Sequence, residues 1–393
     1  MSRVIYVFFV VLLTTSACLS EPAPRVRISA WYWLNAAPKV DWHGDFVTMR
    51  NMGFTDVVLC WGIDTAAFVK RRDDSLYAME AARKAGLGAY VLLWHPEANS
   101  LDREPKYLQV DSANHVLRTF DVFNTEWRNT QWKQFVQKVA EIFGHHPAMA
   151  GYVFDDSFEI GGTGTVSYGE YERQRFGHDL PRNPKDPFWR EWCEARAQWW
   201  EDWARDTNSF IRAVDPDRKH LIYLEDTAGQ ILSPKLRETA GVDFLRIARH
   251  FDAVGGYIFG GHWDYLPDSG QKMAEQSQTM INDLRLTLGQ KQRIIYTFWV
   301  ANNSKKGSPP AQYPTADQIR LVCETALRAG INYLDMYGFR IGDPGSTPEE
   351  TERGEPGSGP SYPLTGQFPQ TFLWDRPEVH DPLGNFLRGL NTR

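Results

Sequence analysis

Two patterns of apolar residues alternate along the sequence: short continuous runs, and longer stretches in which apolar residues recur every three to four positions. The longer stretches predict amphipathic helices, because this spacing places the apolar residues on one helix face. One helix is predicted between residues 127 and 143, where Trp132, Phe135 and Val139 share a face. Another begins after Thr315, whose side chain is suited to capping a helix N-terminus, and ends at Gly330.

The short runs predict eight β-strands, each followed by a helical stretch. The predicted strands are Arg27–Asn35, Asp56–Trp61, Gly88–His95, Ala150–Phe154, His220–Leu224, Asp252–Phe259, Arg293–Val300 and Ile331–Tyr337. This number and order predict an α/β fold, a (β/α)8 TIM barrel that forms a single domain over residues 21–393. An open doubly wound sheet is the alternative, but no glycine-rich dinucleotide-binding turn follows the first strand.

The first twenty residues carry the features of an export signal. Arg3 is followed by an apolar run from Val4 to Leu13, and then by small and hydroxylated residues before Cys18. The run is too short to span a bilayer as a helix. Residues 1–20 are therefore predicted to be a signal peptide, and the mature protein to be periplasmic, extracellular or attached to the bacterial cell envelope. Two cleavage modes compete: Cys18 is lipidated if Thr15 to Cys18 acts as a lipoprotein signal, and otherwise an ordinary signal peptidase cuts nearby.

Charge and cysteine content argue against several classes of function. The net charge of the chain is −6, and the lack of a basic excess argues against a nucleic-acid partner. Cys60, Cys193 and Cys323 are scattered and odd in number, which favours buried thiols over a disulfide framework or a zinc site. The 15 Trp residues are more informative, because indole faces pack against sugar rings, although they equally fill protein cores.

The stretch from Gly151 to Gly162 contains the strongest chemical signal. A strand-like apolar run leads into the adjacent Asp155 and Asp156, and Glu159 follows before two glycines. Neighbouring carboxylates repel each other, so one is expected to have a raised pKa and to act as an acid while the other stays ionised. The stretch therefore predicts a catalytic site at the end of the fourth strand.

Consecutive residues of a regular strand point to opposite faces, so only one of the two Asp side chains enters the barrel. With Tyr152 and Phe154 inward, Asp156 faces the barrel mouth. With Val153 inward, Asp155 does so instead. We favour Asp156, because it lies further along the strand, where substrate can reach it.

In a (β/α)8 barrel the site lies at the carboxyl ends of the strands. Five of the eight predicted strand ends carry an indole, with acids and amides between them. This mixture suits a carbohydrate, whose ring faces are apolar and whose hydroxyl groups need hydrogen-bonding partners. The predicted catalytic residues are Asp155, Asp156 and Glu225, and the predicted substrate-binding residues are Trp33, Trp61, Trp94, His95, Glu159, His262, Trp263, Asp264, Trp299, Asn302, Tyr337 and Arg340.

These residues give the sequence a resemblance to the (β/α)8-barrel glycoside hydrolases. His146-Pro147-Ala148, shortly before Gly151, is similar to the segment that leads into the fourth strand of many of them. The largest clan of these enzymes has Asn-Glu after strand four and a Glu after strand seven. This chain has Asp155-Asp156 at the first place and no acid from Trp299 to Asn302 at the second, so the usual two-glutamate assignment does not transfer.

Two other assignments are implied by resemblance. Phe154-Asp155-Asp156 is similar to a motif of the O-GlcNAcase-like family, in which an Asp pair on strand four assists an N-acetyl group of the substrate. Other barrel families pair an Asp on strand four with a Glu on strand five, which corresponds here to Asp156 and Glu225.

The combined prediction is an exported glycoside hydrolase that cleaves an oligo- or polysaccharide by carboxylate acid/base catalysis. The sequence implies no cofactor and no metal. The expected partner is the carbohydrate substrate, with membrane contact only through Cys18. Two alternatives remain open: a carbohydrate-binding barrel without activity, because the seventh strand end lacks an acid, and a metal-dependent hydrolase or lyase that uses His95 and Glu97.

Overall fold

The computed structural model describes residues 26–61, 65–93, 104–154, 168–216, 221–227, 238, 241–258, 269–289, 293–300, 314–340 and 373–392. In the strand segments 221–227 and 256–258, and at residue 299, only the backbone is described. The predicted signal peptide, residues 1–20, lies outside the described residues.

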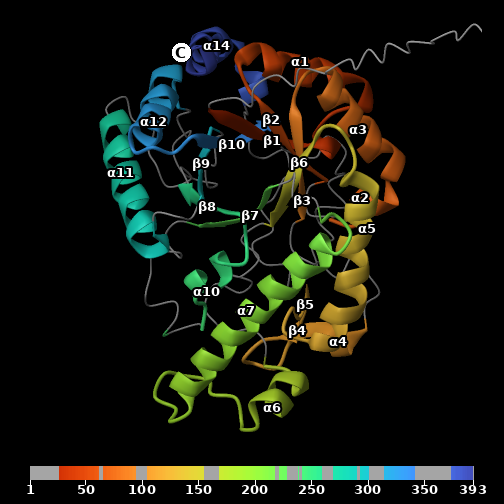
Figure 1. Cartoon of the computed structure of the whole chain (residues 1–393). Coiled ribbons are helices and arrows are strands. Elements are labelled where there is room, and N and C mark those ends of the chain that lie inside the picture. Colours follow the sequence, from red (N-terminus) through yellow and green to blue (C-terminus); the bar gives the residue numbers. More distant parts are fainter. Residues whose placement is uncertain are drawn as a thin grey trace, which may run out of the picture.

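Eight parallel strands pair side by side into a closed barrel (Figure 1). Their order is β1-β10-β9-β8-β7-β6-β3-β2, and β2 pairs again with β1. The strands are β1 (Arg27–Trp33), β2 (Asp56–Cys60), β3 (Gly88–Leu93), β6 (Met149–Phe154), β7 (Leu221–Thr227), β8 (Ala253–Ile258), β9 (Arg293–Trp299) and β10 (Tyr333–Arg340). Each predicted strand coincides with one of them, so the predicted parallel α/β architecture is confirmed.

Helices cover the outside of the barrel (Figure 1). Those that follow the strands are α1 (Trp42–Met52), α2 (Ala67–Lys70), α3 (Arg72–Lys84), α5 (Lys133–Phe143), α7 (Trp189–Arg212), α10 (Phe244–Ala248), α11 (Ser269–Leu288), α12 (Ala316–Arg328) and α14 (Pro377–Thr392). The predicted cap of α12 is confirmed, because Thr315 Oγ1 accepts a hydrogen bond from the Gln318 N–H at 3.2 Å. In return, Gln318 Oε1 accepts from the Thr315 N–H at 2.8 Å.

An extension that the sequence did not predict stands beside the barrel, below it in Figure 1. It consists of the antiparallel strands β4 (Leu108–Val110) and β5 (Val116–Phe120), the short helices α4 (Thr125–Trp127) and α6 (Glu170–Phe176), and the start of α7. Short helical turns at Leu34–Ala36, Lys39–Asp41, Pro105–Tyr107, Arg128–Trp132 and Leu373–Asp375 complete the elements. The charge-rich segment from Glu170 to Arg175 lies in α6, and Glu172 is buried there.

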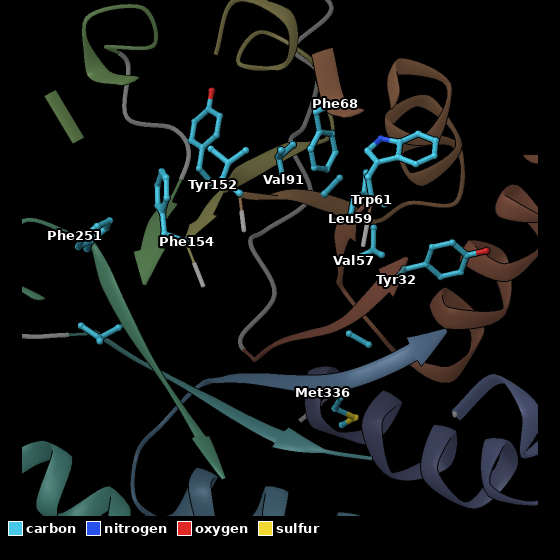
Figure 2. Close-up of a cluster of buried hydrophobic side chains, with 14 of the residues drawn as sticks. Tyr32, Val57, Leu59, Trp61, Phe68, Val91, Tyr152, Phe154, Phe251 and Met336 are labelled. Atoms are coloured by element: carbon cyan, nitrogen blue, oxygen red, sulfur yellow. The ribbon is translucent and has the colours of Figure 1, made fainter. Parts of the chain in front are cut away.

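Side chains alternate between the barrel interior and the helix layer along each strand. On one face, an interior cluster includes Trp31, Trp33, Val58, Cys60, Tyr90, Leu92, Ala150, Val153, Ala253, Ile295 and Tyr333. The other face packs against the helices in a larger outer core, which includes Tyr32, Leu59, Val91, Tyr152 and Phe154 (Figure 2). Membership of one cluster or the other therefore shows whether a strand residue faces into the barrel or away from it.

Two sequence expectations concern cysteines and membrane helices. Cys60, Cys193 and Cys323 are buried free thiols, as predicted. None of the helices in the described part of the chain combines the length and the apolar composition that crossing a bilayer requires.

Charged and aromatic side chains close the base of the barrel, where the strands begin. Arg27 Nε donates to Asp56 Oδ2 at 3.0 Å. The Arg27 guanidinium lies 5.4 Å from the ring centroid of Tyr90 and 5.6 Å from that of Tyr333. Asp56 is buried and thereby shielded from solvent. A buried carboxylate needs a partner of opposite charge, which is Arg27 here.

Both ends of the described chain meet at this base. The Val26 N–H, immediately before β1, donates to Asn391 Oδ1 near the end of α14 at 3.0 Å. The contact joins the first strand to the last helix and leaves the opposite, carboxyl edge of the barrel clear of both.

Gly88 begins β3 directly against Asp56. A Cβ at position 88 would lie 2.2 Å from Asp56 Oδ1 and 3.2 Å from the Ala150 Cβ. Gly88→Ala is therefore expected to disturb the Arg27–Asp56 pair and to lower the free energy of unfolding by about 1–3 kcal/mol, the usual cost of overpacking, as measured in urea. Gly44→Ala in α1 is the control, because a Cβ there meets nothing within 4 Å. An equal loss of stability in both variants would contradict the proposed clash.

Candidate active site

Most of the predicted site residues lie outside the described part of the chain. These are Trp94, His95, Asp155, Asp156, Glu159, His262, Trp263, Asp264 and Asn302. For Glu225 in β7 and Trp299 in β9, the structure describes the backbone. The side chains of Trp33, Trp61, Tyr337 and Arg340 are described, and they divide between the two faces of the barrel.

The faces of β6 are the reverse of the arrangement that would place Asp156 at the barrel mouth. Val153 belongs to the interior cluster, whereas Tyr152 and Phe154 belong to the outer core. The Tyr152 hydroxyl donates to Asp215 Oδ2, just beyond the end of α7, at 3.2 Å. Phe154 packs against the rings of Trp132 and Trp203, with centroids 6.4 Å and 6.0 Å away. The register that turns Tyr152 and Phe154 inward is therefore wrong.

A bulge at the start of β6 explains this register. The pairing of β6 with β3 passes from Met149 to Gly151 and leaves Ala150 as an extra residue. Ala150 and Val153 both belong to the interior cluster although they are three positions apart, whereas a regular strand alternates every two. Counting along an unbroken strand gives no sign of this extra residue.

The backbone register extends from β6 into the next two strands. Val153 pairs with Tyr223 of β7, and Tyr223 pairs with Ala253 of β8. Val153 and Ala253 both belong to the interior cluster. Glu225 follows Tyr223 by two residues, so its backbone position belongs to the same face of the sheet and lies closer to the carboxyl edge.

On the opposite side of the barrel, β1, β9 and β10 surround a buried carboxylate. Asp335 of β10 is 0% exposed. Its Oδ2 accepts from Trp31 Nε1 at 2.7 Å and from Thr297 Oγ1 at 3.4 Å, and its Oδ1 accepts from Ser29 Oγ. Asp335 is absent from the predicted site residues. The signal that could have found it is a single acid within an otherwise apolar strand.

Trp33 and Tyr337 are the predicted substrate-binding residues that the described structure brings to the interior face at the carboxyl edge. Trp33 ends β1 within the interior cluster, and Tyr337 packs against that cluster. The Tyr337 ring centroid lies 4.9 Å from that of Trp31, and the two rings meet edge to face at 65°. Tyr337 is half-buried, whereas Trp31 is fully buried.

Trp61 lies on the other face, which corrects the expectation that it lines the mouth. Its Nε1 donates to Ser75 Oγ of α3 at 2.9 Å. Its ring contacts Trp42 of α1, with centroids 5.9 Å apart, and the Arg71 guanidinium at 5.0 Å. Trp61 therefore joins the barrel to its helix layer.

Arg340 also turns away from the interior, which corrects a second expectation. Its Nη1 donates to Asp45 Oδ2 of α1 at 2.7 Å, and its guanidinium lies 3.8 Å from the ring centroid of Trp374. The Asp45 carboxylate also accepts from the Tyr32 hydroxyl at 2.5 Å and from Trp374 Nε1 at 3.0 Å. Burial, reinforced by Asp45, raises the pKa of Tyr32. This group joins β1, β10 and α1 to the segment that leads into α14.

A buried acidic pair lies in the extension. Asp121, which follows β5, and Glu172 of α6 are both buried, together with Arg196 of α7. Asp121 Oδ1 accepts from the Phe123 N–H at 3.0 Å, and Glu172 Oε2 accepts from the Gly169 N–H at 3.0 Å. Burial, and then the charge of Glu172, raise the pKa of Asp121 well above its ordinary value, while Arg196 opposes the shift.

This pair adjoins the place where the chain returns from the predicted catalytic segment. Residues 155–167 lie outside the described residues, and Tyr168 follows them. The Tyr168 N–H donates to the Val110 carbonyl oxygen of β4 at 2.8 Å. The extension therefore holds the chain directly after the segment that contains Asp155, Asp156 and Glu159.

Within the described residues, no group of three His, Cys, Asp or Glu side chains is arranged to hold a metal ion. His95 and Glu97, the residues of the metal-dependent alternative, lie outside that part of the chain.

Known proteins resemble this chain in structure. No family model matches it, and no curated protein matches it in sequence. Beta-galactosidase from the psychrophilic Marinomonas ef1 matches with a TM-score of 0.63 at 15% sequence identity, over 80% of this chain and 54% of that one. The endo-1,4-beta-D-mannanase of Thermotoga petrophila RKU-1 matches with a TM-score of 0.55 at 12% identity, over 94% and 99% of the two chains. The catalytic domain of beta-amylase from Paenibacillus polymyxa matches with a TM-score of 0.56 at 10% identity, over 81% and 93%.

The shared feature is the fold. These neighbours are (β/α)8 glycoside hydrolases, so the resemblance inferred from the sequence is confirmed at the level of architecture. At 10–15% identity the likeness assigns neither an activity nor a substrate to this chain. The chain also spans only about half the length of the beta-galactosidases it matches, 54% and 53% in two of them.

Proposed function

We propose that this protein is an exported glycoside hydrolase built on a single (β/α)8 catalytic barrel. The observation that carries the proposal is the face of β6, where Val153 is interior. Asp155 follows Val153 by two residues, so we assign it to the barrel mouth by strand alternation. The fold likeness to beta-galactosidase, mannanase and beta-amylase barrels supports a carbohydrate substrate.

Glu225 is the proposed partner of Asp155. The strands β6 and β7 are neighbours, and Val153 pairs with Tyr223, two residues before each acid. Neighbouring strands lie about 4.8 Å apart, so the two carboxyl groups would both reach one glycosidic bond. One carboxylic acid would protonate the glycosidic oxygen, and the other carboxylate would act as nucleophile or as base for water.

Asp156 has a supporting role in this proposal. By alternation it falls on the helix-layer side of the strand end, next to Asp155, where its negative charge raises the pKa of its neighbour. If the substrate carries an N-acetyl group, Asp155 and Asp156 would instead act together on that group, as the similarity of Phe154-Asp155-Asp156 to the O-GlcNAcase-like motif implies.

The sugar-binding surface combines described and undescribed residues. Trp33 and Tyr337 support an aromatic wall at the carboxyl edge of β1 and β10. The other proposed contacts end or follow neighbouring strands, and they are Trp94, His95, Glu159, His262, Trp263, Asp264, Trp299 and Asn302. Residues 1–20 are proposed to direct export, with Cys18 as a lipid attachment site if the lipoprotein signal is used.

Turnover of 4-nitrophenyl glycosides tests the proposed function. The panel contains galactosides, mannosides, glucosides and N-acetylhexosaminides, each assayed with and without EDTA. We expect release of 4-nitrophenol from at least one glycoside and no effect of EDTA. Proton NMR of the first product then gives the stereochemistry: retention indicates carboxyl groups about 5 Å apart, and inversion about 6.5–9.5 Å. Loss of activity with EDTA would favour the metal-dependent alternative.

A carbohydrate-binding barrel without activity is the second candidate. The observation that favours it is the lack of an acid from Trp299 to Asn302, at the end of β9. Such a protein would bind a sugar but release no 4-nitrophenol from any glycoside, and replacement of Asp155 or Glu225 would leave its sugar affinity nearly unchanged.

A further inference from the structure

The buried carboxylate of Asp335 is not required to fill the barrel. Other interior residues, such as Ile295 of β9, are apolar and fully buried. An apolar side chain of similar volume would fill the position without the cost of removing a polar carboxyl group from water. Asp335 accepts hydrogen bonds from Ser29 and Trp31 of β1 and from Thr297 of β9, the strands on either side of β10.

Asp335 accepts a hydrogen bond from the indole of Trp31, and the Tyr337 ring packs against that indole. The Trp31 N–H donates to Asp335 Oδ2 at 2.7 Å, and the ring of Trp31 meets the ring of Tyr337 edge to face at 4.9 Å. Because χ2 of an indole has broad preferences, a hydrogen bond to the ring N–H selects its orientation. Tyr337 lies two residues beyond Asp335 on the same face, about 7 Å nearer the carboxyl edge.

The pairing of β1 with β10 is irregular at this point. β1 has one residue, Trp31, opposite residues 337–339 of β10. Such bulges re-aim side chains and are frequent beside active sites. Trp31 is 0% exposed, whereas Tyr337 is half-buried, so Tyr337 is the member of this group that a ligand can reach.

We propose that Asp335 is a positioning residue of the sugar site, acting through Trp31 on Tyr337. By holding the indole N–H, it fixes the ring against which Tyr337 packs, and so the face that Tyr337 presents at the barrel mouth. The expected ligand is a pyranose ring, whose apolar face stacks on an aromatic side chain held in one orientation. The inference rests on the proposed carbohydrate substrate.

Trp31→Phe and Asp335→Asn test the proposal on the aryl glycoside that the wild-type protein hydrolyses fastest. Trp31→Phe removes the N–H and keeps an aromatic ring, and Asp335→Asn replaces one accepting carboxyl oxygen with an NH2 group that cannot accept. Each is expected to raise KM about tenfold, the scale of one lost buried hydrogen bond. The value of kcat and the pH profile should stay unchanged, because neither side chain touches the reacting atoms.

The double variant separates one shared path from two independent losses. If Asp335 acts through Trp31, Trp31→Phe/Asp335→Asn raises KM about tenfold, no more than either single variant. A rise of about a hundredfold, the product of two independent effects, overturns the proposal.

Trp42→Phe is the matched control. Trp42 is also buried, and its Nε1 donates one hydrogen bond, to the Ala37 carbonyl oxygen at 3.1 Å, but it packs in the outer core. Its KM is expected to equal that of the wild type. A tenfold rise in this variant too would mean a general loosening of the protein and would overturn the assignment to Asp335.

Crystal structures of the wild type, Trp31→Phe and Asp335→Asn give a readout that needs no turnover. The Tyr337 ring is expected to leave its 65° contact in both variants. An unmoved Tyr337 ring in both overturns the inference. If the wild-type protein hydrolyses no glycoside, the proposed function fails, while the position of the Tyr337 ring still decides whether Asp335 is a positioning residue.

Discussion

Asp155→Asn is expected to lower kcat by at least about a hundredfold, the scale of a lost general acid or base. The expectation follows from β6, in which Val153 is interior and the next residue of the same parity is Asp155. Asn keeps the size of the side chain but cannot exchange a proton, so the free energy of unfolding should be unchanged. Initial rates on the best glycoside, together with urea unfolding of each variant, check the prediction.

Asp156→Asn is the matched comparison. By alternation, position 156 shares the helix-layer face of Phe154, so the expected loss of turnover is smaller and arises from removing the charge that tunes Asp155. A larger loss in Asp156→Asn would reverse the assignment. Near wild-type rates in both variants would exclude the strand-four acids and make Glu225 with Asp264 the pair to examine.

Arg196→Met is expected to lower the free energy of unfolding by about 3–5 kcal/mol at pH 7, the usual cost of removing one partner from a buried charged group. Arg196 is 1% exposed, and Asp121 and Glu172 are 3% and 1% exposed, so solvent cannot replace the lost charge. Met is an unbranched apolar side chain that can pack beside Phe123 and Trp192, whose ring centroids both lie 5.1 Å from the guanidinium. Urea unfolding gives the value, and a loss below about 1 kcal/mol, within the range of an exposed ion pair, would contradict it.

The acidic pair gives this prediction a pH dependence. Burial and Glu172 raise the pKa of Asp121, so at intermediate pH the folded protein holds a proton that the unfolded chain has lost. The contribution of Asp121 to stability is therefore greatest below its unfolded pKa, which is about 3.9 for Asp, and is lost as the pH rises through the raised folded pKa. The other titratable groups packed around Arg196 are Tyr168 and Cys193, and burial raises the pKa of both.

Asp121→Asn isolates this effect. The amide keeps an acceptor for the Phe123 N–H and removes the titrating group. The free energy of unfolding should then depend less on pH, and at pH 8 the variant should be more stable than the wild type. In the Arg196→Met background, the same change should recover part of the lost stability. Wild-type and Asp121→Asn curves that run parallel between pH 4 and 8 would exclude Asp121 as the titrating group.

The positions of the strands could be predicted because strands of a parallel sheet are buried on both faces and therefore form continuous apolar runs. The start of α12 could be predicted equally well, because Thr315 and Gln318 cap the helix through contacts between residues close in sequence. The short strands β4 and β5 have no comparable signature in the sequence, because they are only three and five residues long.

The face of the sheet on which a residue lies was harder to predict from the sequence than the strand to which it belongs. One extra residue, Ala150, reverses the inner and outer sets of β6, and the adjacent Gly151 is its one local sign, because glycine inside a strand often marks a bulge. A Trp at a strand end suits a sugar site and a helix interface equally well, and Trp61 proved to belong to the interface. The acid that the structure buries inside the barrel, Asp335, was not singled out because Ser29, Trp31 and Thr297, which donate to it, lie on other strands.

Because both ends of the described chain meet at the base of the barrel, a lipid attached near the N-terminus would fix the orientation of the protein at the cell envelope. Cys18 precedes Val26 by eight residues, which span at most about 29 Å when fully extended. With the proposed lipid on Cys18, this tether would leave the barrel from the side where Val26 contacts Asn391 of α14. The mouth would then open away from the bilayer, toward long polysaccharides in the surrounding medium rather than toward lipid headgroups.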